Sequence, residues 1–586
     1  DWVGSFTAAA GCAIYDGGTW PAEYNGDYFC TEPTINIIHH ARLTPQGTSY
    51  TFHKLPGREE TEFVRSKDMW WRPIEARIGP DGALYIADFY NQAVIHNDTR
   101  GPDHNKVNAA VRPDRDHYFG RIWKIDHKDA KKIAVPDLSK ASVKELVAAL
   151  EHPNKAVRMT ASRLLVEREV NLPKRTRMPT AAETAADREQ MEKDFGLDSL
   201  AALAINASKS VDARVAALWT IGTKGTLHAL VAIGTCLSDK EPAIRRNAAL
   251  LAEGFTFGQG DGITLNFVNS FKKGAPMAEL LTDSDAQVRL AALRALASCN
   301  VPANATHKMA RDISAYAARD IVAAWPKFDD DFQRSAAVSA LAGYIGDAIP
   351  AILDRGDASL APLASILVQN IGDKNDAVAA AKLVVSLATQ PAAADALKRS
   401  ILDTLGKSLK ADPEMTPELS SALGKLLASG ATSGNASLAS SALPLAARWD
   451  KAGSLKSEVA KLSGTLLAQL ADAKAADDAR INAAGSLIGL RSMNAEILPA
   501  VISQLGRDGR APFKRQLIVA LGETGDAEVG KALAANFSKL PADSQTAAFD
   551  TVLKRSEWAL AFLDAVGTKQ IDALTLGPAN AARLRT

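Results

Sequence analysis

The chain has 586 residues, and 68 Lys and Arg balance 67 Asp and Glu, so its formal charge of +1 gives no field that attracts nucleic acid or an anionic membrane. Hydrophobic residues at 47% and charged residues at 23% exclude a mostly disordered chain and a collagen-like chain. The length predicts several folding units. The longest apolar stretch, residues 336–353, contains Asp347, so we expect no membrane-spanning helix.

Residues 1–127 differ in composition from the rest, because they hold 18 of the 35 aromatic residues and seven of the ten histidines. Short β-branched or aromatic runs at 28–31, 35–43, 50–55, 83–87 and 120–125 are separated by turn-forming residues, which predicts strands. Small antiparallel units of this kind are typical of propeller blades, and about 40–50 residues make one blade. The segment therefore predicts an incomplete β-propeller.

The pattern becomes helical after a predicted linker at 128–141, beginning with a capping box formed by Ser142 and Glu145. A short unit then recurs at 154–158, 212–215, 241–245 and 285–289. In each copy a capping residue is followed, three positions on, by an apolar residue that is expected to face the core. The spacing of the copies approaches the roughly 40–47 residues of HEAT repeats. The expected fold is thus mixed and multidomain: partial propeller, then a HEAT-like α-solenoid at 142–570 with an insertion at about 171–196, and a linker at 571–586.

Several motifs in the first segment carry a family resemblance. They include Tyr-Asp-Gly-Gly at 15–18, Trp-Arg-Pro at 71–73, Gly-Pro-Asp-Gly-Ala-Leu-Tyr at 79–85 and Asp-Phe-Tyr-Asn at 88–91. Residues 7–127 resemble the last blades of the planctomycete and verrucomicrobial "membrane-bound dehydrogenase" proteins, a haem-binding family related to glucose/sorbosone dehydrogenases. The resemblance implies an exported oxidoreductase, periplasmic or at the cell surface, that uses pyrroloquinoline quinone and calcium to oxidise a sugar or alcohol. It also implies electron transfer to a c-type cytochrome.

The resemblance assigns a cofactor-binding role to Arg72. In the quinone enzymes two arginines before the Pro-Asp-Gly turn hold the cofactor; Arg72 matches the first and Ile74 stands in place of the second. The catalytic histidine belongs to an earlier blade, so no catalytic residue is assigned on this chain. Read from the residues alone, Arg72 could bind a carboxylate or stack on a ring, or it could pair with Glu75 or Asp88.

A second candidate site is a cluster in the loops around two strands. Carboxylates, imidazoles and guanidiniums gathered there could bind a metal or an anionic cofactor. The alternative is a hydrogen-bond network that fixes a long loop. The cluster comprises Asp88, Asn91, His96, Arg112, Asp114, Arg115, Asp116 and His117, and the sequence names no metal for it.

The four cysteines have neither the CxxC spacing of a zinc or redox motif nor the CxxCH of covalent haem attachment. We therefore expect no covalent haem on this chain. Cys12 and Cys30 flank short strand-like runs and could form a disulfide, or they could be free thiols.

Two functions follow from these patterns. The first is part of a quinone-dependent dehydrogenase whose catalytic blades are missing, so enzymatic activity stays uncertain. The alternative is a non-catalytic scaffold or assembly subunit that binds a protein partner on the solenoid. The absence of a GxxxxGK[ST] loop, an HExxH helix and a GxSxG elbow argues against ATPase, zinc-protease and esterase activity.

Overall fold

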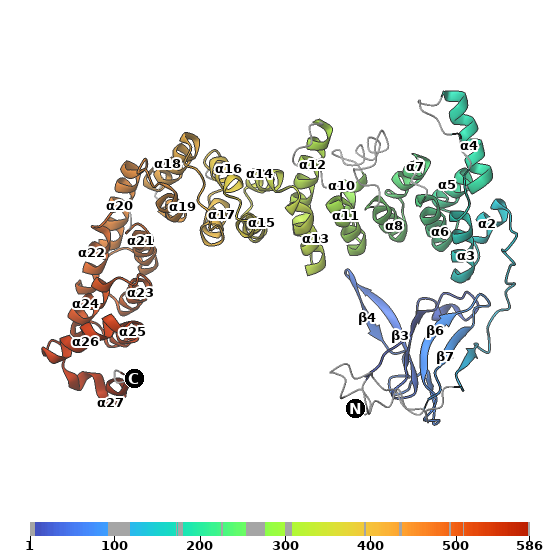
Figure 1. The fold of residues 1–586 in the computed structure, drawn as a ribbon, viewed down its shortest axis with the longest axis horizontal. Coiled ribbons are helices and arrows are strands. Elements are labelled where there is room, and N and C mark those ends of the chain that lie inside the picture. The colour runs from blue at the N-terminus through green and yellow to red at the C-terminus, as the bar shows by residue number, and fades with distance from the viewer. Residues whose placement is uncertain are drawn as a thin grey trace. The chain divides into compact units, whose positions relative to one another are not determined.

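The structure is a computed structural model, and it forms two compact units, Asp1–Tyr344 and Ile345–Thr586. The first unit contains all the described strands together with the first helices (Figure 1). The units therefore divide well after the predicted linker at 128–141, because the strand-rich head packs on the first helices. The structure describes residues 6–91, 118–170, 173, 180–223, 227–253, 276–298, 308–391, 394–432, 436–491, 494–507 and 509–583.

The described head (residues 6–91 and 118–130) consists of two small antiparallel sheets. One has the order β1-β2-β3-β4 with β5 also paired to β3, and the other has the order β6-β7-β8. The expected antiparallel strands are present, but the two sheets do not form a closed ring, so a propeller is not shown. The strands are β1 (Cys12–Ile14), β2 (Tyr28–Glu32), β3 (Ile37–Gln46), β4 (Ser49–His53), β5 (Val64–Arg65), β6 (Pro73–Ile78), β7 (Leu84–Asp88) and β8 (Arg121–Ile125).

The core of the head lies between the two sheets and is largely aromatic. Tyr15 and Trp20 stack at 4.4 Å between ring centroids, and Phe29 and Trp71 are buried with them. The Tyr15 hydroxyl donates to the carbonyl of Gly82 at 2.9 Å, so the buried phenol also fixes the Gly79–Gly82 turn. Aromatic burial on this scale explains why this segment is so rich in rings.

His40 lies at the edge of this core, stacked on Phe29 at 4.5 Å, with its Nε2 2.9 Å from Asp27 Oδ2. Burial lowers the pKa of His40 below its ordinary value, and the neighbouring Asp27 opposes this shift only in part. The unfolded chain therefore takes up a proton at a higher pH than the folded head does. We expect the free energy of unfolding of the head to be highest above about pH 6.5 and to fall as the pH drops below it.

Hydrogen exchange of β2 and β3 between pH 5 and 8 measures this loss of stability, after the rates are corrected for the pH dependence of intrinsic exchange. His40→Gln should flatten the pH dependence, whereas His53→Gln, on the exposed strand β4, should leave it unchanged. An equal slope in the wild-type protein and His40→Gln would contradict the assignment.

Helices follow the head as antiparallel pairs, and the predicted capping box is confirmed: Glu145 N–H donates to Ser142 Oγ, and Ser142 N–H to the Glu145 carboxylate. In the first unit the helices are α2 (Val143–Ala149), α3 (Lys155–Val166), α4 (Ala181–Phe195), α5 (Leu197–Ile205), α6 (Val211–Gly222), α7 (Leu227–Cys236), α8 (Pro242–Glu253), α10 (Pro276–Leu280), α11 (Ala286–Ser298), α12 (Lys308–Ala324) and α13 (Asp331–Ala342). Here α3, α6, α8, α11 and α13 pack side by side as the second helix of each pair, and we call them B helices.

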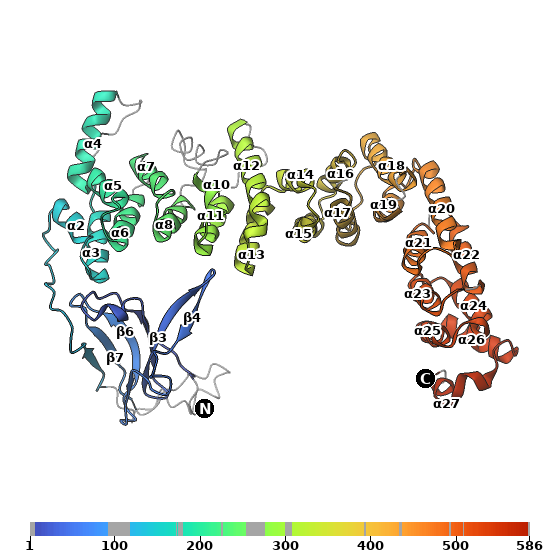
Figure 2. The same cartoon turned by 180° about the vertical axis from the view of Figure 1, so that it is seen from behind.

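The second unit repeats this arrangement, with α15, α17, α19, α21, α23 and α25 as its B helices (Figure 2). A helical solenoid is therefore present in each unit. The helices are α14 (Ile345–Arg355), α15 (Ala361–Asp373), α16 (Ala377–Leu387), α17 (Asp395–Ser408), α18 (Pro417–Thr432), α19 (Ala436–Trp449), α20 (Lys456–Ala471), α21 (Asp477–Gly489), α22 (Ile497–Ile502), α23 (Ala511–Gly522), α24 (Ala527–Asn536), α25 (Ala542–Val552), α26 (Ser556–Gly567) and α27 (Ala573–Arg583).

A buried basic residue recurs as the fourth residue of the B helices. In α6 it is Arg214, whose Nε donates to Ala204 O at 3.0 Å, and in α21 it is Arg480, whose Nε donates to Leu470 O at 3.0 Å. Each thereby satisfies a carbonyl at the C-terminal end of the preceding helix, where positive charge is favourable. The buried examples, 1–6% exposed, are Arg158, Arg214, Arg289, Lys398, Arg480 and Lys514.

One boundary differs from the sequence-based expectation, because α27 occupies most of residues 571–586, which were expected to be a linker. The expected insertion at about 171–196 contains α4, an additional helix that begins with a second capping box at Thr180 and Glu183. Across the described ranges, no single helix is long and apolar enough to cross a membrane, and α13 with α14 meets that test only as a bent pair.

Candidate functional site

The B helices share a face formed by their second, fifth, sixth and ninth residues. These positions fall on one side of a helix because they are three or four residues apart. Large apolar side chains are exposed there: Met159 at position five of α3, Trp219 at position nine of α6, Phe332 at position two of α13 and Val519 at position nine of α23 are between 41% and 63% exposed. We call this surface, defined by these four positions, the B face.

The same positions line a long cleft in the second unit. The cleft has a volume of about 950 Å³ and crosses α17, α19 and α21. Its lining includes positions five, six and nine of each of these helices, among them Arg399, Ser441 and Asn482. A neighbouring hollow of about 490 Å³ is lined by Arg515, Gln516 and Val519 of α23, at the same three positions. The B face in this unit therefore combines small and hydroxyl- or amide-bearing residues with a few charged ones, among them Arg399, Asp403 and Arg515.

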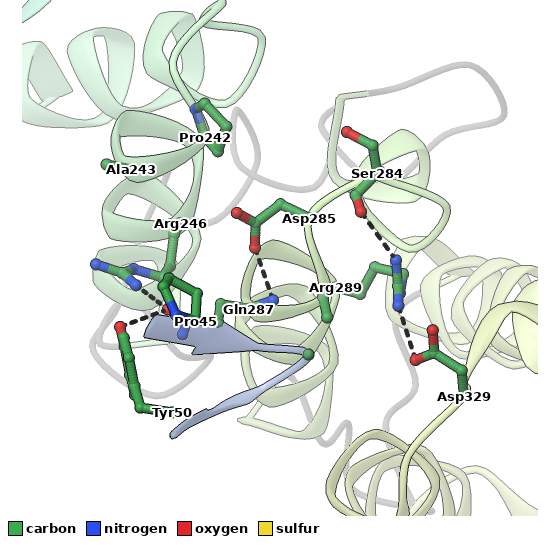
Figure 3. A pocket seen from close by; sticks show the side chains of 12 residues that line it. Pro45, Tyr50, Pro242, Ala243, Arg246, Ser284, Asp285, Gln287, Arg289 and Asp329 are labelled. Atoms are coloured by element: carbon green, nitrogen blue, oxygen red, sulfur yellow. Dashed lines mark hydrogen bonds and ion pairs between the residues drawn. The ribbon is translucent and has the colours of Figure 1, made fainter. Parts of the chain in front are cut away.

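In the first unit the B face meets the head. The β3–β4 ribbon projects toward α11 and α13, and a cleft of about 370 Å³ lies between the ribbon and the first turns of α8 and α11 (Figures 1 and 3). Tyr50 Oη donates to Gln287 Oε1 at 3.3 Å, and Arg246 Nη1 donates to the same oxygen. Gln287 and Arg246 occupy positions two and five of their helices. The ribbon therefore touches the very face that is open elsewhere.

The local sequence explains the shape of the ribbon. Gly47 has φ +58° at the first position of a two-residue loop, as a tight hairpin turn requires. Thr48 is the second residue of this loop, and its Oγ1 donates to Asp330 Oδ2 at 2.9 Å, at the start of α13. Two strands alone are marginally stable in water, so these contacts at the tip set where the ribbon lies.

The far wall of this cleft is held by Arg289. Its Nη1 donates to Asp283 O at 2.8 Å and Nη2 to Asp329 Oδ1 at 2.9 Å, while Nε donates to Gln333 Oε1 at 2.6 Å. Hydrogen bonds from Gln333, together with Arg289, hold the pKa of Asp329 below its ordinary value. The Arg289 guanidinium is thus used in hydrogen bonds between neighbouring helices of the solenoid, whereas the half-buried Arg246 faces the cleft (Figure 3).

Arg72, the expected cofactor ligand, lies elsewhere and is 5% exposed. Its Nη1 donates to Pro33 O at 2.8 Å and to Thr34 O at 3.1 Å, and its Nε donates to Asn91 O at 3.1 Å. Burial lowers the pKa of Arg72. The guanidinium therefore links the backbone at Pro33 and Thr34 with that at Asn91, inside the head, where Arg72 is almost fully buried.

Two members of the loop cluster can be placed. Asp88 is 3% exposed; its carboxylate accepts the N–H groups of Arg72 and Tyr90 and the Nε1–H of Trp123 at 2.8–3.0 Å. Asn91 is buried beside the Arg72 side chain. For these two, the structure gives the hydrogen-bond network of the second interpretation. His96, Arg112, Asp114, Arg115, Asp116 and His117 lie outside the described residues.

Arg72 and Asp88 use their charged atoms for hydrogen bonds within the head. The described ranges contain no group of three His, Cys, Asp or Glu side chains that could hold a metal ion. Binding of pyrroloquinoline quinone or calcium by this chain stays a prediction. Cys12 and Cys30 are both free thiols in the structure, and they lie opposite each other on β1 and β2.

Comparison with known proteins finds one matching family model and many similar solved structures. Residues 1–129 match the model of a domain of unknown function, DUF7133. No curated protein sequence is significantly similar to this chain. Similar solved structures include Kap121p bound to Pho4p, with 13% identity, a TM-score of 0.38, and coverage of 75% of this chain and 48% of that one. The karyopherin Kap121p bound to the SUMO protease Ulp1p has 13% identity, a TM-score of 0.37, and coverage of 75% and 56%.

The Kap95:Nup1 complex has 12% identity and a TM-score of 0.31, with coverage of 76% of this chain and 66% of that chain. The matches thus span about half to two thirds of the solved chains. The expectation of a quinone-dependent dehydrogenase is contradicted, because Arg72, its expected cofactor ligand, is 5% exposed and its guanidinium donates to backbone carbonyls of the head. The resemblance to the "membrane-bound dehydrogenase" family, and the compartment it implies, stay predictions.

Sequence reasoning missed the residues that form the clefts. Gln287 lies within one of the repeated units from which the solenoid was predicted and Arg246 directly follows another, but the repeat spacing signals only core and capping positions. The available signal was that, within each B helix, the exposed positions are three or four residues apart. Tyr50 carried no signal, because its partner Gln287 is 237 residues away.

Proposed function

We propose that this chain is a non-catalytic scaffold that binds a protein partner along its B face. The observation that carries the proposal is that clefts in both units include B-face positions, namely two and five of α8 and two of α11 in the first unit, and five, six and nine of α17, α19 and α21 in the second. Extended surfaces of this kind are the usual binding surfaces of helical solenoids.

The chemistry of the clefts favours an extended peptide segment as the bound element. The second-unit cleft presents hydroxyl and amide side chains, such as Ser441 and Asn482, with the guanidinium of Arg399. Hydroxyls and amides both donate and accept hydrogen bonds, so they can pair with a peptide backbone of any sequence. Exposed Val519 adds a site for an apolar side chain.

Site-specific photo-crosslinking of the full chain in its native host tests the proposal. We expect a photoreactive residue at Met159 or Val519 to crosslink to a protein partner, because both side chains are exposed on the B face. Matched controls are Val231 on α7 and Val378 on α16, which are 64% and 65% exposed but lie on the first helices of their pairs. Equal crosslinking at all four positions, or none at the B-face positions, would refute it.

A further inference from the structure

The N-terminal sheet brings two cysteines into register. Cys12 on β1 and Cys30 on β2 are direct partners in an antiparallel pair. Tyr15 N–H bonds to Asp27 O on one side of them, and Thr31 N–H bonds to Gly11 O on the other, both at 2.9 Å. Since bonded and non-bonded pairs alternate, Cys12 and Cys30 form a non-hydrogen-bonded pair, whose Cα atoms are typically about 4.5 Å apart. That spacing lies inside the range of natural disulfides, roughly 4.4–6.8 Å.

The two thiols differ in access. Cys12 is exposed, whereas Cys30 is 5% exposed. Directly opposite residues project from the same face of a sheet, and Tyr28, two residues before Cys30, shares that face. Burial raises the pKa of the Cys30 thiol, and a hydrogen bond with Tyr28 opposes the rise. Cys12 is therefore the thiol that an oxidant reaches first, and Cys30 is placed to complete the reaction.

We propose that Cys12 and Cys30 are a redox-active dithiol that closes a cross-strand disulfide by exchange with a small-molecule disulfide. The Cys12 thiolate attacks the small disulfide, forming a mixed disulfide and releasing one small thiol. The Cys30 thiolate then attacks the Cys12 sulfur and releases the second small thiol. Two protein thiols are oxidised and one small disulfide is reduced to two thiols, so electrons and protons balance.

Closing this bond fixes the strand at a junction in the head. Immediately before Cys12, Gly11 N–H donates to Ile74 O at 2.9 Å, which joins β1 to the sheet formed by β6, β7 and β8. A side chain at Gly11 would lie 2.3 Å from Glu75 Cα, so the two backbones approach closely there. The disulfide therefore holds together both sheets of the head, and the redox state of the compartment sets how firmly they are joined.

The test equilibrates the full-length protein with mixtures of reduced and oxidised glutathione, then quenches with acid, alkylates and maps peptides by mass spectrometry. We expect a linked peptide pair containing Cys12 and Cys30, lighter by two hydrogen atoms, while Cys236, buried in α7, stays a free thiol in the same sample. Hydrogen exchange of β1 and β2 should slow on oxidation in the wild-type protein and stay unchanged in Cys12→Ser.

Two outcomes would overturn the proposal. One is that both thiols remain alkylatable in excess oxidised glutathione, while the unfolded chain oxidises under the same conditions. The other is that Cys12 accumulates only as the mixed disulfide with glutathione, which would show that Cys30 cannot reach it. Cys12→Ser is expected to fold, because the replaced side chain is exposed.

Discussion

Replacing Arg214 by methionine is expected to lower the free energy of local unfolding of α5 and α6 by about 3–5 kcal/mol, the range for breaking a buried ion pair. Arg214 is 1% exposed and donates to Ala204 O at 3.0 Å and to both carboxylate oxygens of Asp239. Methionine fills most of the volume but leaves Asp239 without its cation, and the Ala204 carbonyl keeps only the weak Cys236 thiol donor. Hydrogen-exchange mass spectrometry on peptides from α5 and α6 measures the loss.

The matched control is Arg163→Met on α3. Arg163 is exposed and pairs with Glu167 one helical turn away, so its replacement should change the local free energy by less than about 0.5 kcal/mol. A similar loss of protection in both variants would show that the buried position is unimportant. So would full protection of α6 in Arg214→Met.

The ion pair between Arg214 and Asp239 also predicts that the stability of α6 depends on pH. Burial would raise the pKa of Asp239, but hydrogen bonds from Arg214 and Glu241 N–H, with the positive charge of Arg214, outweigh burial and hold it below the ordinary value. A lowered folded-state pKa gives stability that is complete above the ordinary carboxyl pKa of about 3.9 and is lost as the pH falls through the folded value. Protection of α6 in the wild-type protein should therefore decline below about pH 4, and this decline should be smaller in Arg214→Met.

Replacing Asn154 by alanine is expected to weaken the connection between the head and the first helices by about 2–4 kcal/mol, from one helix cap and two buried carbonyls. Asn154 is fully buried at the N-cap of α3. Its Oδ1 accepts Ala156 N–H at 2.8 Å, and its Nδ2 donates to Gly17 O and Gly79 O at 3.1 and 2.8 Å. Hydrogen exchange should increase in α3 and in both head turns.

Asn154→Asp separates the two roles of this side chain. The carboxylate still caps α3 but has no donor for the carbonyls of Gly17 and Gly79, so exchange should increase in the head turns and stay low in α3. Asp376→Ala, which removes the N-cap of α16 in the second unit, is the control for a cap alone and should cost about 1 kcal/mol. If Asn154→Asp behaved like the wild-type protein, the amide donors would not join the head to α3.

Arg72 and Asn154 show that a sequence motif does not predict the hydrogen-bond partners of a buried side chain. The Trp-Arg-Pro motif predicted a cofactor ligand at Arg72, yet carbonyls of Pro33, Thr34 and Asn91 surround its guanidinium. Asn154 was recognised only as the first residue of a repeated unit, yet its amide reaches two turns of the head. In both cases the side chain's partners lie far away in the sequence, where a local motif carries no information.

The sequence by itself determined the elements whose causes are local. Alternation predicted a strand at 83–87, where β7 forms, the Ser142 and Glu145 pair predicted the start of α2, and repeat spacing predicted the paired helices, because backbone geometry and capping act over a few residues. Only the tertiary structure decided which positions remain open. The B face emerges when successive helices stack, and Tyr50 meets Gln287 only because the head folds back on the helices. Such contacts depend on packing between distant segments, which no local pattern encodes.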